Sequence, residues 1–148
     1  MKGLLIADTA VVVVFAASGR SSHDEGLDPV AVLGTAWPFL VGLGAGWLLT
    51  KALARTGAGR TAGELADSAS TWLPSRVGGY LVILGATVGG GMLLRQLTDA
   101  GTATAFIIVA VGFNAIGFAA VRAPGWYRML RDRRAAGSGA TDRVPVSR

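Results

Sequence analysis

An acidic residue lies within the first long apolar run of the chain, at Asp8. An ionisable group at the centre of a bilayer costs roughly 2.5–3.5 kcal/mol on insertion scales, and such groups often mark ion or proton pathways. Asp8 lies only about one helical turn after Leu4, however, where water or a basic partner such as Lys2 or Arg122 can reach it. Two interpretations stay open: an interfacial capping or pairing acid, which the shallow position favours, and a proton or cation ligand.

Asn114 is the other strongly polar residue within an apolar run. If both runs cross a membrane, Asn114 and Asp8 lie in the same half of the bilayer, and a hydrogen bond between them would satisfy both. Measured interhelical hydrogen bonds of this kind average only about 0.6 kcal/mol. We favour a packing role for Asn114 over a role as a ligand.

Four further residues that can carry charge flank the apolar runs: Arg20, His23, Arg95 and Asp99. Two guanidinium groups on one face of a membrane could form an anion site, and His23 would change its charge between about pH 5 and 8. In the simpler alternative, the arginines extend to lipid headgroups or pair with nearby acids such as Asp99. We favour this alternative.

The composition excludes several kinds of chemistry. The chain has no cysteine and one histidine, so we expect no disulfide, no metal site and no bound cofactor. It also lacks a Gly-x-Ser-x-Gly motif and any cluster of acids at metal-ligand spacing. We therefore expect a protein that is not an enzyme.

Four apolar stretches are long enough to cross a bilayer, which takes about 20 residues. They are residues 4–19, 30–50, 77–94 and 103–121. None has the alternation of a membrane β-strand, and an open sheet cannot satisfy its backbone in lipid. The sequence predicts an all-α integral membrane bundle of four transmembrane helices.

The first stretch has a second interpretation. Lys2, the apolar run and Ala16-Ala17-Ser18 resemble a cleavable signal peptide. Asp8 argues against cleavage, because the hydrophobic region of a signal normally has no acid. We favour a retained span.

Basic residues predict the orientation. Of the 14 lysines and arginines, 12 precede the first stretch, lie between the second and third, or follow the fourth; only Arg20 and Arg95 do not. We therefore expect both termini in the cytoplasm, a multi-pass protein of the plasma membrane, and the lipid bilayer rather than nucleic acid as its partner. Residues 1–122 form the membrane domain, and residues 123–148 form a basic cytoplasmic tail that is disordered from residue 137.

The long inner connection contains Thr61-x-x-Glu64, a capping-box pattern, followed by apolar residues at helical spacing as far as Leu73. It predicts a short interfacial helix, with a disordered loop as the alternative.

Proline and glycine within the runs indicate kinks and close helix contacts. Trp37-Pro38-Phe39 places a proline inside the second run, where it frees a carbonyl group and bends the axis. Small residues four apart allow helices to approach closely. This spacing occurs at Gly42 and Gly46, and again at Gly85 and Gly89.

Several segments, taken in order, resemble a family of bacterial and archaeal membrane proteins called domain of unknown function 3054. They are Asp8 with its apolar run, Gly19–His23, Trp37–Phe39 leading into Gly42–Trp47, Gly91–Arg95 and Gly101–Phe106. The resemblance covers about residues 4–122 and implies a membrane-embedded protein with no assigned activity. The chain departs from the family pattern at residues 122–126, which read Arg-Ala-Pro-Gly-Trp where Gly-Trp-Arg is expected, so the resemblance assigns no role to Arg122.

Two functions are consistent with these features. The first is a small transporter or channel-like permease that uses Asp8 and the cationic residues, although Asp8 is shallower than the buried acid of small four-span multidrug exporters. The second is a non-catalytic partner or assembly subunit of a membrane complex, or a homo-oligomer, for which the glycine-rich faces are suited. The sequence slightly favours the first.

Overall fold

A computed structural model describes residues 2–21, 28–56 and 73–141 of the 148-residue chain. These residues form α1 (Lys2–Ser21), α2 (Pro29–Thr56), α4 (Val77–Leu97) and α5 (Thr104–Thr141), and none of them lies in a strand. Each helix contains a stretch long and apolar enough to cross a membrane. Hydrocarbon offers the backbone no hydrogen-bond partner, so even the valine-rich run of α1 is helical. The predicted all-α class with four such helices is confirmed, and the chain is a membrane protein.

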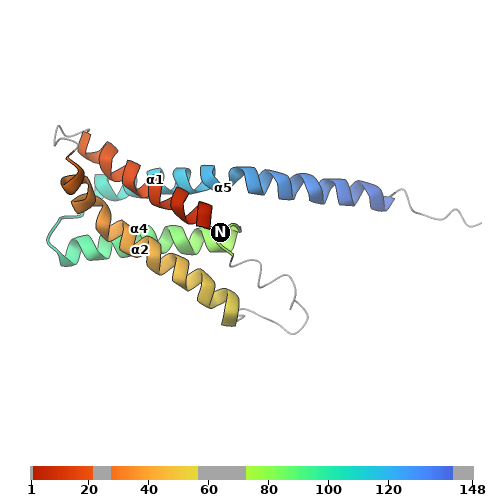
Figure 1. The fold of residues 1–148 in the computed structure, drawn as a ribbon, viewed down its shortest axis with the longest axis horizontal. Coiled ribbons are helices and arrows are strands. Elements are labelled where there is room, and N and C mark those ends of the chain that lie inside the picture. Colours follow the sequence, from red (N-terminus) through yellow and green to blue (C-terminus); the bar gives the residue numbers. More distant parts are fainter. Residues whose placement is uncertain (1, 22–27, 57–72, 142–148) are drawn as a thin grey trace, which may run out of the picture.

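The helices extend beyond the predicted spans. α5 continues without a break through the domain boundary predicted at residue 122, and residues 137–141 are helical where disorder was predicted. His23, residues 142–148 and the predicted interfacial helix, apart from Leu73, lie outside the described residues. Figure 1 shows the second half of α5 projecting well beyond the other helices.

Local sequence signals set two of the helix boundaries. Asp28 precedes Pro29, and its carboxylate accepts a hydrogen bond from the backbone N–H of Ala31 at 3.0 Å, as expected of an N-cap followed by proline. Farther along the chain, the turn between α4 and α5 places Asp99 at φ 53° and Gly101 at φ 72°. Aspartate and glycine are the residues that tolerate this left-handed backbone.

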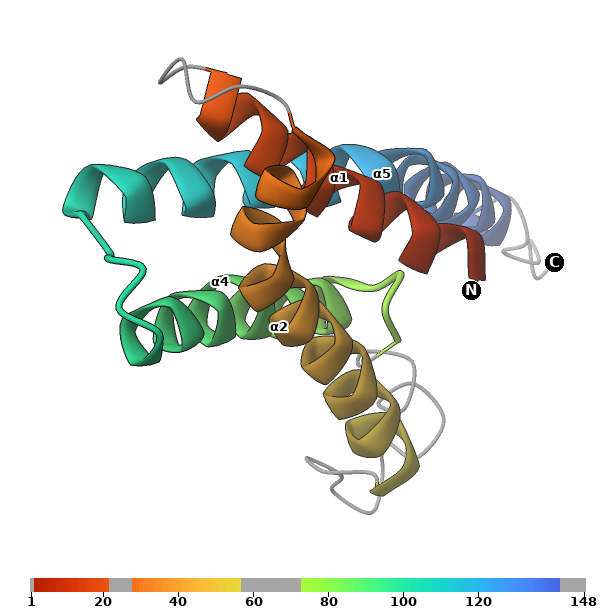
Figure 2. The ribbon, with the colours of Figure 1, turned by 60° about the vertical axis from the view of Figure 1, so that its left-hand side comes forward.

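The four helices pack in a ring. α2 packs against α1 and α4, and α5 packs against the other sides of the same two helices, with the most extensive contact between α2 and α4. Neighbours in the chain run in opposite directions, so the starts of α1 and α4 and the end of α2 lie at one end of the bundle (Figure 1). The α4–α5 turn lies at the opposite end (Figure 2).

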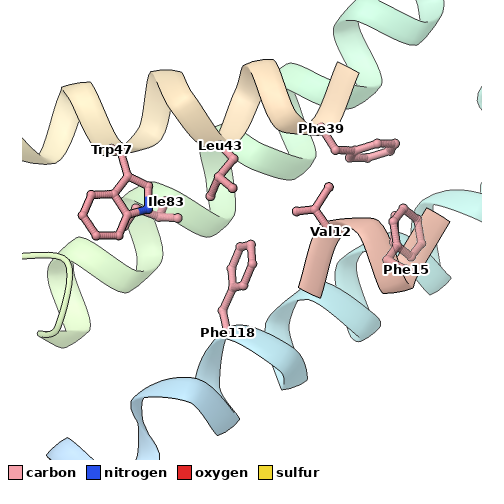
Figure 3. Packing of buried hydrophobic residues seen from close by; sticks show 8 residues of the cluster. Val12, Phe15, Phe39, Leu43, Trp47, Ile83 and Phe118 are labelled. Carbon is pink, nitrogen blue, oxygen red and sulfur yellow. The ribbon is translucent and has the colours of Figure 1, made fainter. Parts of the chain in front are cut away.

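The core brings apolar side chains from all four helices together. Phe15 of α1 and Phe39 of α2 meet edge to face, with ring centroids 5.2 Å apart. Figure 3 shows Phe118 of α5 pointing from below into the space between α1 and α2. The other buried members of this cluster are Val12, Leu43, Trp47, Ile83 and Ala110. These contacts fix the helices relative to one another and so position the polar residues described below.

Two of the predicted glycine contacts occur and two do not. A Cβ atom at Gly42 would lie 2.5 Å from the backbone oxygen of Ala86, and one at Gly46 would lie 2.9 Å from Cα of Ile83. Both glycines therefore let α2 approach the α4 backbone closely. At Gly85 and Gly89, by contrast, none of the described residues lies within 4 Å of the added Cβ atom. The packing predicted for that pair is not found within the described chain, because this face of α4 points away from the bundle.

The proline of α2 is buried against its neighbours. Pro38 lies inside α2 and its side chain is fully buried, whereas Trp37 beside it is 41% exposed. In Figure 2 the first turns of α2 do not continue the line of its longer second part. A change of direction of this kind is expected where proline removes a helical hydrogen bond.

Candidate functional site

Asp8, the acid within the first membrane span, is paired with Arg122, which lies 114 residues later in the chain. Nη1 of Arg122 donates to Oδ1 of Asp8 at 2.7 Å, and Nη2 donates to Oδ2 at 2.8 Å. Both side chains are almost completely buried, at 0% exposure for Asp8 and 1% for Arg122. Two parallel hydrogen bonds between a guanidinium and a carboxylate make the strongest and most directional ion pair available to protein side chains.

The remaining polar atoms of this ion pair are also occupied. Nε1 of Trp47 donates to Oδ2 of Asp8 at 3.1 Å. Arg122 donates through Nε to the carbonyl oxygen of Pro74 at 2.8 Å and through Nη1 to that of Phe118 at 3.0 Å. The pair therefore joins α1, α2, α5 and the segment that leads into α4.

This geometry favours an anchor over an exchangeable ligand site. A carboxylate that already accepts three hydrogen bonds in a buried position has little capacity left for a transported cation. Of the two partners predicted for Asp8, the structure selects Arg122. Of the two surroundings expected for Asp8, water or a basic partner, the structure shows the basic partner, and the side chain has 0% exposure.

The predicted hydrogen bond between Asn114 and Asp8 is not formed. Asn114 is fully buried, but its Nδ2 donates to the carbonyl oxygen of Ala110, one turn earlier in α5, at 2.9 Å. Its Oδ1 has no hydrogen-bond partner among the described residues. Asp8 takes the stronger, charged donor, and this leaves Asn114 bonded within its own helix.

A cavity of about 510 Å³ lies at the opposite end of the bundle, and we call it the end pocket. Its volume falls within the roughly 300–1,000 Å³ typical of small-molecule sites. Arg20 and Arg95 both line it, together with Thr35 of α2 and apolar or small residues of α1 and α5. Those of α1 are Phe15, Ala16 and Gly19, and those of α5 are Ala105, Phe106 and Val109; Ala100, Gly101 and Ala103 come from the turn between α4 and α5.

Arg95 is held in place by the turn that follows α4. Its Nε donates to the carbonyl oxygen of Gly101 at 3.1 Å and its Nη2 to that of Ala100 at 2.7 Å. The guanidinium carbon lies 4.4 Å from the ring centroid of Phe106, a cation–π contact. The predicted pairing of Arg95 with Asp99 is not found among the described ion pairs; the guanidinium donates to the carbonyl groups of the turn instead.

The other predicted residues of the anion site have different outcomes. Arg20, in the last turn of α1, shares the end pocket with Arg95. His23 lies outside the described residues, so the structure does not place it. Across residues 2–21, 28–56 and 73–141, no three histidine, aspartate or glutamate side chains gather in a way that could hold a metal ion.

The sequence does not predict the other hydrogen-bond partners of the Asp8–Arg122 pair. Arg122 was considered as one possible partner but not as a site residue, and neither Trp47 nor the carbonyl group of Pro74 was singled out. One signal was available: Ala110, Asn114, Phe118 and Arg122 recur every four residues and share one buried face of α5. An arginine on that face needs a buried acid, and Asp8 is the only acid within a span.

Comparisons with known proteins identify a family but no activity. No curated protein matches the chain, and no solved structure matches it. Residues 5–124, which include both the ion pair and the end pocket, match the family described as a protein of unknown function, DUF3054. This chain belongs to the DUF3054 family.

Proposed function

We propose that this protein is a small permease-type membrane protein that binds an anionic solute in the end pocket as the first step of its transport. The observation that carries the proposal is a cavity of about 510 Å³ with two arginines in its wall, at one end of a membrane-spanning bundle. Positive charge in a partly enclosed, low-dielectric cavity concentrates anions. In this proposal Asp8 and Arg122 hold the bundle together and do not carry the substrate.

The orientation is part of the proposal. We place both termini in the cytoplasm of the cell and the end pocket on the outer face of the plasma membrane. The distribution of 12 of the 14 basic residues supports this. The chain has no cysteine, so single-cysteine variants test it directly. An impermeant maleimide should label Thr98→Cys on intact cells and Asp132→Cys only after lysis; the reverse pattern refutes the orientation.

Transport is tested in proteoliposomes with toluenesulfonate, a permanently charged organic anion. Uptake is driven by an inside-positive potassium diffusion potential and compared with that of protein-free liposomes. We expect uptake by the wild type, a large loss in Arg95→Gln, and no change in Arg131→Gln. Arg131→Gln is the matched control, because this substitution removes the same charge from a side chain that is 70% exposed. Wild-type uptake equal to that of empty liposomes refutes the transport proposal.

A second candidate is a non-catalytic subunit of a membrane complex or a homo-oligomer. The observation that favours it is the face of α4 that points away from the bundle. There, none of the described residues lies within 4 Å of a Cβ atom added at Gly85 or Gly89. Small residues four apart admit a further transmembrane helix. Crosslinking of native membranes followed by mass spectrometry tests this role. Links from α4 to another chain support it, and links confined within single chains count against it.

We also propose, from the sequence, that the protein is not an enzyme. The chain has no cysteine and a single histidine, which excludes thiolate chemistry and paired imidazoles. In the described part of the chain, the only acid buried in the bundle core is Asp8, and it is occupied by Arg122.

A further inference from the structure

We infer that the end pocket takes an amphipathic anion, with one anionic head and a single short apolar chain. The inference deepens the proposed function, because it rests on the same pocket and adds the chemical class of the ligand. It follows from the order in which polar and apolar groups line the cavity.

The head group is assigned to Arg95. A guanidinium has five N–H donors, and the two hydrogen bonds to Ala100 and Gly101 use two of them. Three donors therefore stay available among the described contacts, on a group whose position is already fixed by the turn and by Phe106. A preorganised guanidinium binds a sulfonate, phosphate or carboxylate with little loss of side-chain entropy.

The apolar chain is assigned to the deeper part of the pocket. Arg20 lies in the last turn of α1, whereas Phe15 and Ala16 lie about one turn closer to the middle of the bundle. On α5, which begins at Thr104, Val109 likewise lies more than one turn inward. The wall thus changes from charged at the end of the bundle to apolar toward its centre, which is the polarity of an amphiphile aligned with the helices.

The size of the cavity limits the apolar part. A volume of about 510 Å³ suits a molecule of ordinary small-ligand size. The head-group chemistry is shared by soluble amphiphilic anions and by single-chain anionic lipids, so the experiment separates these two sources.

The test measures equilibrium binding of radiolabelled decanesulfonate to the full-length protein in nanodiscs of uncharged phosphatidylcholine, after subtraction of binding to empty nanodiscs. Unlabelled decanol, which has the same chain without the charge, is the competitor for the head-group requirement. Octanesulfonate in solution and lysophosphatidylglycerol in the bilayer are the competitors for the two sources. Three variants are compared with the wild type: Arg95→Gln removes the head-group donor, Val109→Trp fills the apolar end, and Arg131→Gln is the charge-matched control.

We expect saturable binding to the wild type and to Arg131→Gln, roughly tenfold or greater weakening in Arg95→Gln, and little competition by decanol. Val109→Trp should weaken binding equally while leaving Arg95 in place; because Val109 is 56% exposed, this variant should fold even if Arg95→Gln does not. Stronger displacement by lysophosphatidylglycerol identifies a lipid ligand, and stronger displacement by octanesulfonate identifies a soluble one; either supports the inference. Binding unchanged in Val109→Trp, or competed equally by decanol, overturns it.

The result separates this inference from the proposed function. Saturable decanesulfonate binding without toluenesulfonate uptake refutes transport and keeps the ligand class. Toluenesulfonate uptake without decanesulfonate binding refutes the ligand class and keeps transport.

Discussion

Replacing Asp8 by alanine should destabilise the protein severely, because it leaves a charged arginine buried without its counter-ion. The side chain of Arg122 is 1% exposed and, among the described residues, would keep only the carbonyl oxygens of Pro74 and Phe118 as acceptors. Removing one partner of a buried ion pair typically costs about 3–5 kcal/mol. Trp47 loses its acceptor as well, so we expect the free energy of unfolding to fall by at least about 3 kcal/mol.

Removing both charges should cost much less than removing one. When a buried ion pair is replaced by apolar residues of similar size, stability often changes little. The double variant Asp8→Leu, Arg122→Met should therefore recover most of the stability lost in either single variant. The expected coupling energy of about 3 kcal/mol would show that the cost of each single change comes from an unpaired buried charge.

The assay is unfolding in mixed micelles at increasing mole fractions of sodium dodecyl sulfate, followed by tryptophan fluorescence. Asp132→Ala is the matched control, because it removes a carboxylate from an ion pair with Arg131 in which both side chains are about 70% exposed. Exposed pairs contribute about 0–1 kcal/mol. If Asp8→Ala is as stable as Asp132→Ala, or if the effects of the two single core changes simply add, the reasoning is wrong.

Three further predictions concern packing, processing and a single hydrogen bond. Gly42→Ala should lower the free energy of unfolding in the same assay by about 1–3 kcal/mol, because its Cβ atom would lie 2.5 Å from the backbone oxygen of Ala86. Gly85→Ala is the control: none of the described residues lies within 4 Å of its added Cβ atom, so this change should be neutral or slightly stabilising. Equal effects at the two sites would contradict the packing described. Intact-mass measurement of the membrane-purified protein should find α1 retained, since its loss would remove Asp8 from Arg122; a mass that corresponds to cleavage after residues 16–18 would support the signal-peptide interpretation instead. Tyr80→Phe should cost about 1 kcal/mol, because the hydroxyl group donates to the carbonyl oxygen of Ala115 at 3.1 Å; no loss in the unfolding titration would show that this contact between α4 and α5 contributes nothing.

The sequence by itself determined that the chain forms four helices able to cross a membrane. That property is local: the free energy of placing about 20 residues in hydrocarbon is summed along one helix and depends little on its neighbours. The N-cap at Asp28 and the left-handed turn residues Asp99 and Gly101 are local in the same way, because each depends on the backbone preferences of its own segment.

Only the tertiary structure decided which polar and small residues meet. The sequence offered three possible partners for Asp8: the basic residues Lys2 and Arg122, and the amide of Asn114. Whether Asp8 bonds to Arg122 or to Asn114 depends on how α1 and α5 are rotated about their own axes. Helix rotation also decides which glycines make contacts. Gly42 lies against the α4 backbone, whereas Gly85 faces away from the bundle, although each has a second glycine four residues later. The end pocket also depends on the tertiary structure, because its two arginines come from different helices. Arg20 of α1 and Arg95 of α4 line one cavity only in the packed bundle. Helix rotation is set by the whole core at once, and no single stretch of sequence encodes it.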